Sequence, residues 1–347
     1  MGEYFSIRWV DGMVRMLDQR LLPDEVVYHD YIHCSDIATA IRDMVIRGAP
    51  AIGVAAAFGL ALTALSSSAK TTSDLIKQLD TSSVELKGSR PTAVNLSWAI
   101  DRINKVIELN AGMGLVQLKD RILVEAQNIY AEDVQMDYKI AQNGQKFIPN
   151  QANLIHHCNT GGLATAGIGT ALGVIRLAHE KGKNVHVFID ETRPRLQGAR
   201  LTAWELKQLG IPHTLIVDGA SGYIMKNHKI DACLVGCDRI AANGDIANKI
   251  GTYNLALVAA AHGVPFYSAG PTTSLDLSIT SGDQIPIEER PEEEVTHIQA
   301  HPITPPEVTV ANPAFDVTPA RYITAIITDR GVAYPPYTES LAGLKKL

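Results

Sequence analysis

The fold of the second half of the chain is indicated by the stretch Leu154-Ile155-His156-His157-Cys158-Asn159-Thr160-Gly161-Gly162. A short apolar run, as long as a buried strand, leads here into a polar turn and a glycine pair, and we expect a helix to open near Ala164. Further short β-rich runs alternate with helical stretches; they are Val185-His186-Val187-Phe188-Ile189, Thr214-Leu215-Ile216-Val217, Ala232-Cys233-Leu234-Val235, Pro265-Phe266-Tyr267 and Tyr322-Ile323-Thr324-Ala325-Ile326-Ile327. This alternation predicts an α/β fold, with a Rossmann-like parallel sheet covered by helices on both faces.

The length of 347 residues exceeds what one compact core usually carries, so two domains are expected. We place a smaller N-terminal α+β domain at residues 1–112, a long linking helix at 113–146 and the Rossmann-like domain at 147–347. In the first domain, Asp11-Gly12 between two strand-like runs predicts a β-hairpin. Helices are expected over residues 35–46, from Pro50 and from near Pro91. The linking helix shows apolar residues at helical spacing from Leu115 to Ile140.

The composition limits the classes of partner. Net charge is -6, so no bulk positive field would attract nucleic acid or an anionic membrane. The longest apolar stretch, residues 51–65, is shorter than the roughly 20 residues that span a bilayer, and the N-terminus has no apolar signal core. We therefore expect a cytoplasmic protein. The four cysteines are too few for a disulfide scaffold, and no metal-ligand cluster is apparent, so we expect neither a metal nor another cofactor.

Cys158 stands at the end of the first strand of the sheet, before the glycine pair. Such a turn lets the backbone approach a ligand closely, and a helix N-terminus beside a thiol lowers its pKa. An inert buried cysteine is the ordinary alternative, but this position favours a functional residue. Gly167-Ile168-Gly169 is expected inside the following helix with no strand directly before it, so it does not indicate a dinucleotide site.

Other strand ends also carry polar residues, and parallel sheets bind ligands at the carboxyl ends of their strands. The run from Asp190 to Arg200 has the ordinary interpretation of a solvated loop, but Gln197 before Gly198 resembles a ligand contact at a helix entry. Asp238 follows the fourth strand, a common place for a catalytic or metal-binding carboxylate. Lys249, before a helix expected near Tyr253, is well placed for a phosphate, although an isolated lysine there would ordinarily be a surface residue.

Taken together, these segments resemble the methylthioribose-1-phosphate isomerases of methionine salvage, almost from end to end. In the first domain the resemblance rests on Leu17-Asp18-Gln19-Arg20-Leu21-Leu22-Pro23, Ile46-Arg47-Gly48-Ala49-Pro50-Ala51-Ile52-Gly53 and Ser89-Arg90-Pro91-Thr92. In the second it rests on His157-Cys158-Asn159-Thr160-Gly161-Gly162, Asp190-Glu191-Thr192-Arg193-Pro194, Gly236-Cys237-Asp238-Arg239 and Asn248-Lys249-Ile250-Gly251-Thr252. The motifs are long and several, so the match is specific.

The resemblance implies a homodimer, a sugar-phosphate substrate and Cys158 with Asp238 as the catalytic pair. It also implies substrate contacts at Arg47, Gly48, Ala49, Arg90, Gln197, Asn248 and Lys249. Isomerisation of an aldose 1-phosphate needs help with ring opening and a hydrogen transfer from C2 to C1. The transfer is a proton transfer through an enediol or a hydride shift, and the sequence does not choose between them.

Two other functions stay open at this stage. A ribose-1,5-bisphosphate isomerase would need a second cationic pocket, whereas a methylthio group needs apolar walls; the motif from Leu17 to Pro23 favours the methylthio sugar. A regulatory subunit of a translation initiation exchange factor would be a binding module of similar fold. The presence of Cys158, Asp238 and the cationic residues favours an enzyme.

Overall fold

A computed structural model describes residues 4–91 and 93–346. Thr92, the last residue of one motif named above, lies outside the described residues. Contacts within the chain divide it into two compact units. Unit 1 comprises the chain up to Tyr138 together with Gly161–Gly169, and unit 2 comprises Lys139–Thr160 and the chain from Thr170 onward.

Unit 1 begins with a three-stranded antiparallel sheet of β1 (Ile7–Val10), β2 (Met13–Leu17) and β3 (Tyr28–Tyr31). Asp11 and Gly12 have φ angles of 50° and 84°, the positive values that a tight two-residue turn between antiparallel strands requires. Val10 stands opposite Met13, so the hairpin predicted from the sequence is confirmed.

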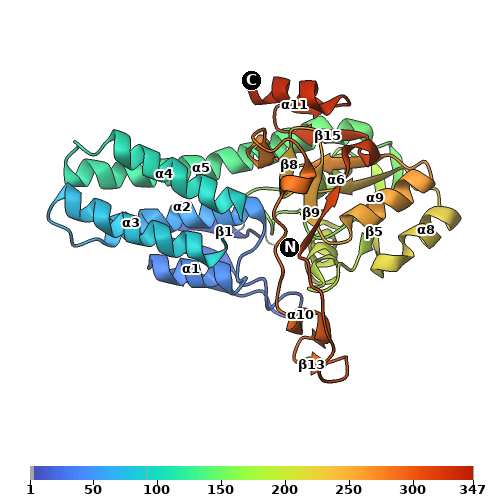
Figure 1. Cartoon of the computed structure of the whole chain (residues 1–347), viewed down its shortest axis with the longest axis horizontal. Helices are drawn as coiled ribbons and strands as arrows, with labels where there is room; N and C mark the ends of the chain where they lie inside the picture. The colour runs from blue at the N-terminus through green and yellow to red at the C-terminus, as the bar shows by residue number, and fades with distance from the viewer. Residues whose placement is uncertain (1–3, 92, 347) are drawn as a thin grey trace. The chain divides into compact units, whose positions relative to one another are not determined.

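Helices follow the small sheet (Figure 1): α1 (Cys34–Arg42), α2 (Ala49–Ser66), α3 (Thr72–Ser89), α4 (Val94–Leu109) and α5 (Leu115–Gly144). The helix expected from Pro50 begins at Ala49, after Gly48 at a φ of 96°, where a Cβ would clash with the backbone of Ala164. The sequence analysis did not anticipate α3, which has a largely polar surface and buries a narrow stripe through Leu75 and Leu79.

Helix α2 is the centre of the unit 1 core. Of the described helices it is the one that is long and apolar enough to cross a membrane, by length and composition alone. However, 72% of its residues are buried, as expected of a core helix. Its Phe58 stacks on Tyr130 of α5 in this core, with ring centroids 5.8 Å apart.

The segment Gly161–Gly169 corrects one expectation, because no helix opens near Ala164. Buried carboxylates of α5 accept the N–H groups of this segment: Ala166 donates to Asp133 over 2.7 Å and Gly169 to Asp137 over 2.8 Å. Because side chains already satisfy these donors, the backbone need not form helical hydrogen bonds there. Helix α6 (Ala171–Glu180) therefore starts later, and Gly167-Ile168-Gly169 precede it rather than lie within it.

Unit 2 is built on a seven-stranded sheet in the order β16-β15-β10-β7-β4-β5-β6. The parallel strands are β4 (Gln151–His156), β5 (Asn184–Asp190), β6 (His213–Ile216), β7 (Ala232–Val235), β10 (Phe266–Ala269) and β15 (Ala325–Thr328), and β16 (Gly331–Ala333) is antiparallel at the edge. The predicted strands are thus confirmed. Their order is that of a doubly wound nucleotide-binding-type sheet, with its switch point between β4 and β7.

Alternate residues of the strands enter two separate cores. Ile155 and Phe188 pack on one face with α8 (Ser221–Asn227), α9 (Thr252–Ala261) and α11 (Tyr337–Lys346). Leu154 and Val187 pack on the other face with α6 and α7 (Ala203–Leu209). Because successive side chains of a strand point to opposite faces, a strand between two helical layers must be apolar at nearly every position. The predicted α/β architecture, with helices on both faces, is confirmed.

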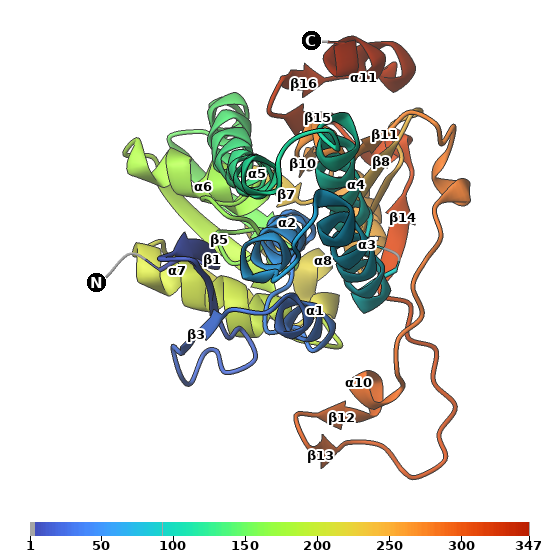
Figure 2. The ribbon, with the colours of Figure 1, turned by 90° about the vertical axis from the view of Figure 1, so that its left-hand side faces the viewer.

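A second sheet of unit 2 has the order β11-β8-β9-β14, formed by β8 (Arg239–Ala241), β9 (Ile246–Lys249), β11 (Leu275–Asp276) and β14 (Phe315–Thr318). Residues 286–314 form an excursion that carries α10 (Glu293–Thr296), β12 (His297–Ile298) and β13 (His301–Pro302) and extends away from the main sheet in two views (Figure 1 and Figure 2). Glu294 of α10 pairs with Arg195 over 2.7 Å and helps to hold the excursion to the loop after β5.

Candidate active site

The two residues expected to act together follow neighbouring strands. Cys158 comes two residues after the end of β4, and Asp238 comes three residues after the end of β7. The strands are parallel and adjacent, with His156 opposite Leu234, so both residues lie at the same edge of the sheet, beside the switch point. Within the same turns, a Cβ at Gly236 would lie 2.7 Å from the Thr160 side chain, which shows how closely the two loops approach.

The loop of Asp238 is fixed to the second sheet. The Asp238 N–H donates to Ala247 O over 2.8 Å, which places Asp238 beside the strand that carries Asn248 and Lys249. Asn248 is buried and donates from Nδ2 to Thr252 Oγ1 over 3.0 Å, at the start of α9. Asp238 is therefore held beside Asn248 and Lys249, two other predicted site residues of unit 2.

Lys249 ends β9, and its side chain is 7% exposed. Its Nζ donates to Ala314 O over 2.7 Å and lies 4.4 Å from the centre of the Phe315 ring, which is a cation–π contact. A buried ammonium held in this way is pre-positioned, with one donor fixed on a carbonyl. The interpretation of Lys249 as an ordinary surface lysine is excluded by its burial.

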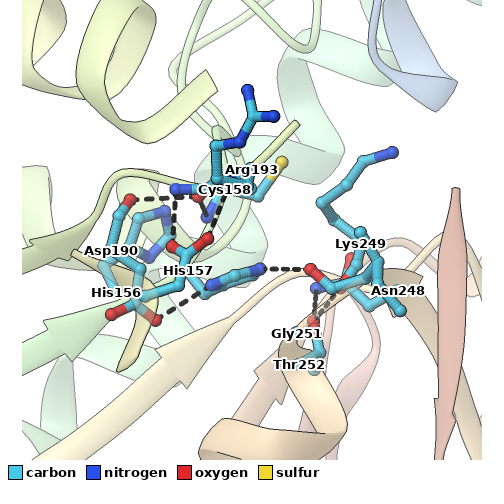
Figure 3. Close-up of polar contacts among 12 residues, drawn as sticks. His156, His157, Cys158, Asp190, Arg193, Asn248, Lys249, Gly251 and Thr252 are labelled. Atoms are coloured by element: carbon cyan, nitrogen blue, oxygen red, sulfur yellow. Dashed lines mark hydrogen bonds and ion pairs between the residues drawn. The ribbon is translucent and has the colours of Figure 1, made fainter. Parts of the chain in front are cut away.

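His157 and Asp190 form a buried pair directly beside Cys158 (Figure 3). His157 Nδ1 lies 2.9 Å from Asp190 Oδ2, and its Nε2 lies 2.8 Å from Ile250 O, to which it can only donate. Burial by itself would lower the pKa of His157, but the hydrogen bond and charge of Asp190 outweigh it and raise that pKa. The pair joins the end of β4 to the turn after Lys249.

His157, Asp190 and Asp218 also have ligand atoms within 4.8 Å of one another, a spacing that a metal ion could use. In the structure, however, the carboxylate of Asp218 accepts the N–H groups of Thr192 and Arg193, each over 2.7 Å. Both ring nitrogens of His157 are engaged as well. A metal there would have to displace these hydrogen bonds, so the geometry is that of a structural network, and the absence of a metal cofactor stays a prediction.

Gln197 lies in the turn after β5, immediately before the π-helical turn Gly198–Thr202. Its side chain is 7% exposed, and among the described residues no donor reaches its Oε1. A buried acceptor without a partner costs about 1–3 kcal/mol, which a bound ligand with a hydroxyl group would recover. The sequence-based hypothesis of a ligand contact at Gln197 thus gains a physical argument.

Four of the expected substrate contacts belong to unit 1. Arg47, Gly48 and Ala49 form the entry to α2, and Arg90 caps the end of α3. The N–H of Ala51 donates to Ala164 O over 3.2 Å, so this entry is held to the segment Gly161–Gly169. Their role as substrate contacts rests on the sequence motifs.

Two threonines beside Cys158 are not predicted as functional residues from the sequence. Thr192 lies within a motif named above, and Thr202 lies outside those motifs. Both are completely buried, and both hydrogen-bond the backbone of Cys158. Nothing in the local sequence distinguishes them from other buried threonines, because their role depends on the backbone conformation of a residue more than 30 positions away.

Comparisons with known proteins place the chain among its relatives. The sequence pattern of the Initiation factor 2 subunit family matches residues 45–335. A protein of Synechococcus sp. named methylthioribose-1-phosphate isomerase is 54% identical over 341 residues, which are 98% of this chain and 98% of that protein.

The chain belongs to the methylthioribose-1-phosphate isomerase family. Solved structures agree with this family assignment. The crystal structure of 5-methylthioribose 1-phosphate isomerase from Pyrococcus horikoshii is 45% identical, with a TM-score of 0.94, and the match covers 99% of this chain and 96% of that one. A structure titled translation initiation factor eIF-2B, subunit delta, from A. fulgidus is 39% identical, with a TM-score of 0.89, and the match covers 99% and 100% of the two chains.

Proposed function

We propose that the protein is an isomerase that interconverts 5-methylthio-D-ribose 1-phosphate and 5-methylthio-D-ribulose 1-phosphate in methionine salvage. One observation carries the catalytic proposal: Cys158 and Asp238 follow two adjacent parallel strands at the switch point of the sheet. The names of the relatives supply the substrate, and the geometry supplies a thiol and a carboxylate at the edge where such sheets bind ligands.

In the proton-transfer route, Asp238 gives its proton to the ring oxygen as the bond between C1 and that oxygen breaks. Cys158, as the thiolate, takes the proton from C2, and a C1–C2 double bond forms. Asp238 then takes back a proton from the C2 hydroxyl, C2 becomes the ketone, and the thiol returns its proton to C1. Both residues end in their starting states, as an isomerisation without cofactor requires.

The substrate needs anchors for its phosphate and hydroxyl groups. Lys249 supplies a buried ammonium, and Gln197 supplies a buried acceptor for a sugar hydroxyl. Asn248 precedes Lys249 on β9, beside the loop of Asp238, and is proposed as a further substrate contact. Arg47, Gly48, Ala49 and Arg90 are proposed as further substrate contacts on the sequence motifs alone.

The test is to incubate the purified protein with methylthioribose 1-phosphate and to follow the ketose by NMR. Asp238→Asn and Cys158→Ser should each reduce turnover by at least ~10²-fold while the protein stays folded. Turnover close to that of the unmodified protein in either variant would remove that residue from the mechanism. Reaction in D₂O tests the proton-transfer route: solvent deuterium at C1 would show that the Cys158 thiol exchanged its proton before returning it, which a hydride shift cannot produce.

A binding function is the second candidate, because the A. fulgidus chain described as translation initiation factor eIF-2B, subunit delta, is 39% identical. A protein that isomerises neither methylthioribose 1-phosphate nor ribose 1,5-bisphosphate, each offered separately, would favour this alternative. We also propose a cytoplasmic homodimer, which light scattering of the purified protein would detect as twice the mass of one chain.

A further inference from the structure

Cys158 has a backbone conformation that ordinary residues avoid. Its φ angle is 67°, in the left-handed region, which costs a residue with a Cβ roughly 1–2 kcal/mol. Two other residues without glycine's freedom, Thr192 and Leu196, have φ angles of 63° and 59° in the loop after the neighbouring strand β5. Strained backbone of this kind persists only where surrounding groups hold it, and it gathers at functional sites.

Two threonine hydroxyls hold Cys158, one on each side of its peptide backbone. Thr192 Oγ1 accepts the Cys158 N–H over 2.9 Å and donates to Asp190 O over 3.0 Å. Thr202 Oγ1 donates to Cys158 O over 2.6 Å and accepts from Asn159 Nδ2 over 3.2 Å. A hydroxyl group is both donor and acceptor, so each threonine completes a short chain of hydrogen bonds through the Cys158 residue.

The threonines are themselves fixed from outside this loop. The N–H groups of Thr192 and Arg193 are held by Asp218, after the end of β6. Thr202 ends the π-helical turn Gly198–Thr202, an irregularity that is frequent at functional sites. Asn159 also donates to Glu205 of α7 over 2.6 Å. The position of Cys158 is therefore determined by two separate elements, and Figure 3 shows its sulfur directed away from the His157–Asp190 pair.

We propose that Thr192 and Thr202 are positioning residues that hold Cys158 in the left-handed conformation and thereby direct its thiol toward the substrate. The inference rests on the proposed catalytic role of Cys158. Without either hydroxyl, a buried N–H or C=O of Cys158 loses that hydrogen bond, and the residue can relax toward an ordinary φ. This relaxation turns the Cα–Cβ bond and moves the sulfur with it. A displacement of about 1 Å at a reacting group can cost 10²-fold in rate.

The experiment compares Thr192→Val and Thr202→Val with Thr192→Ser and Thr202→Ser, which keep the hydroxyl. Thr328→Val is the matched control: Thr328 is also completely buried, and its hydroxyl donates to Gly331 O and accepts from Arg330 N, in a strand on the far side of β10 from β7. For each variant we would measure kcat, KM, the melting temperature and the rate at which iodoacetamide alkylates Cys158, located by peptide mass spectrometry.

We expect the two valine variants to lower kcat by about 10- to 100-fold with KM within about 3-fold, and to change the alkylation rate of Cys158 by several-fold. The serine variants and Thr328→Val should keep the kcat and alkylation rate of the unmodified protein. Folded valine variants with unchanged kcat and unchanged alkylation would overturn the inference. The inference would also be overturned if the melting temperatures of the valine variants fell as much as that of Thr328→Val while their kcat did not change specifically.

Two further readouts keep the inference separate from folding and from the proposed function. In the unmodified protein, the N–H of Cys158 should exchange slowly with D₂O because Thr192 accepts it. Exchange as fast as in an open loop would contradict this hydrogen bond, and the measurement does not need the valine variants to fold. If Cys158→Ser abolishes turnover while folded threonine variants behave normally, the inference fails and the proposed function stands. If the unmodified protein has no isomerase activity, the proposed function fails, while alkylation and amide exchange still decide the inference.

Discussion

Two thiol-free variants of Cys158 would measure the strain in its backbone. Cys158→Gly and Cys158→Ala both remove the sulfur and differ by one methyl group at a φ of 67°. The left-handed conformation costs alanine roughly 1–2 kcal/mol and glycine almost nothing. Glycine loses about 0.5–1 kcal/mol of this advantage because its unfolded chain has more freedom. We therefore expect Cys158→Gly to be more stable than Cys158→Ala by about 1 kcal/mol.

Cys233 provides the matched control. It is completely buried within β7, an extended strand in which glycine is less stable than alanine by about 0.5–1 kcal/mol. The difference between the two substitutions should thus change sign between the two positions. The assay is urea unfolding followed by tryptophan fluorescence, with Trp204 of α7 reporting on unit 2. A Cys158→Gly protein no more stable than Cys158→Ala would refute the argument that Cys158 is strained.

Three further predictions concern charge and buried polar groups. Lys249→Met keeps the apolar part of the side chain but removes the charge. It should raise KM by roughly 10- to 100-fold, since a hydrogen bond to a charged group is worth about 1.5–3 kcal/mol. An unchanged KM would place the phosphate elsewhere. Gln197→Met should raise KM, because the substrate loses a hydrogen-bond acceptor. The free energy of unfolding should stay equal or rise, because the described residues provide no donor for the buried oxygen that is removed. A lower stability in urea would contradict this. Burial raises the pKa of Asp133 to about 6, so the folded protein holds this proton more tightly than the unfolded chain, in which the pKa is near 4. The stabilisation by the bound proton is complete below about pH 4 and is lost as pH rises through 6. As pH rises from about 4 through 6, Asp133→Asn should therefore gain stability relative to the unmodified protein, and parallel pH profiles from urea unfolding would disprove it.

Much of the fold was predictable because its signals are local. The alternation of strands and helices after residue 150 follows from apolar runs such as Leu154-Ile155, whose side chains enter opposite cores. The hairpin at Asp11-Gly12 follows from two residues that tolerate positive φ. In contrast, the start of α6 depends on Asp133 and Asp137, about 30 residues earlier in the chain, which take up the N–H groups of the segment before it. No local pattern contains that information.

The candidate site divides in the same way. Cys158 and Asp238 could be singled out because each follows a strand that the sequence predicts, and parallel topology then brings the strand ends to one edge. The sequence predicts Lys249 near a helix start, but its contact with Phe315, 66 residues further along, depends on the pairing of β9 with β14. The roles of Thr192 and Thr202 required the φ angle of Cys158, which a sequence does not display.

The chain passes between its two units more than once, and this limits where it can be cut to make fragments or chimeras. The chain leaves unit 1 after Tyr138, returns for Gly161–Gly169 and leaves again before Thr170. A fragment that starts near residue 147 would contain Gly161–Gly169 but neither of the carboxylates on α5 that bind its N–H groups. Such a fragment would leave the N–H groups of Ala166 and Gly169 without these acceptors. A chimera of two relatives should therefore take α5 and Gly161–Gly169 from the same parent protein, and a fragment that contains unit 2 should include α5.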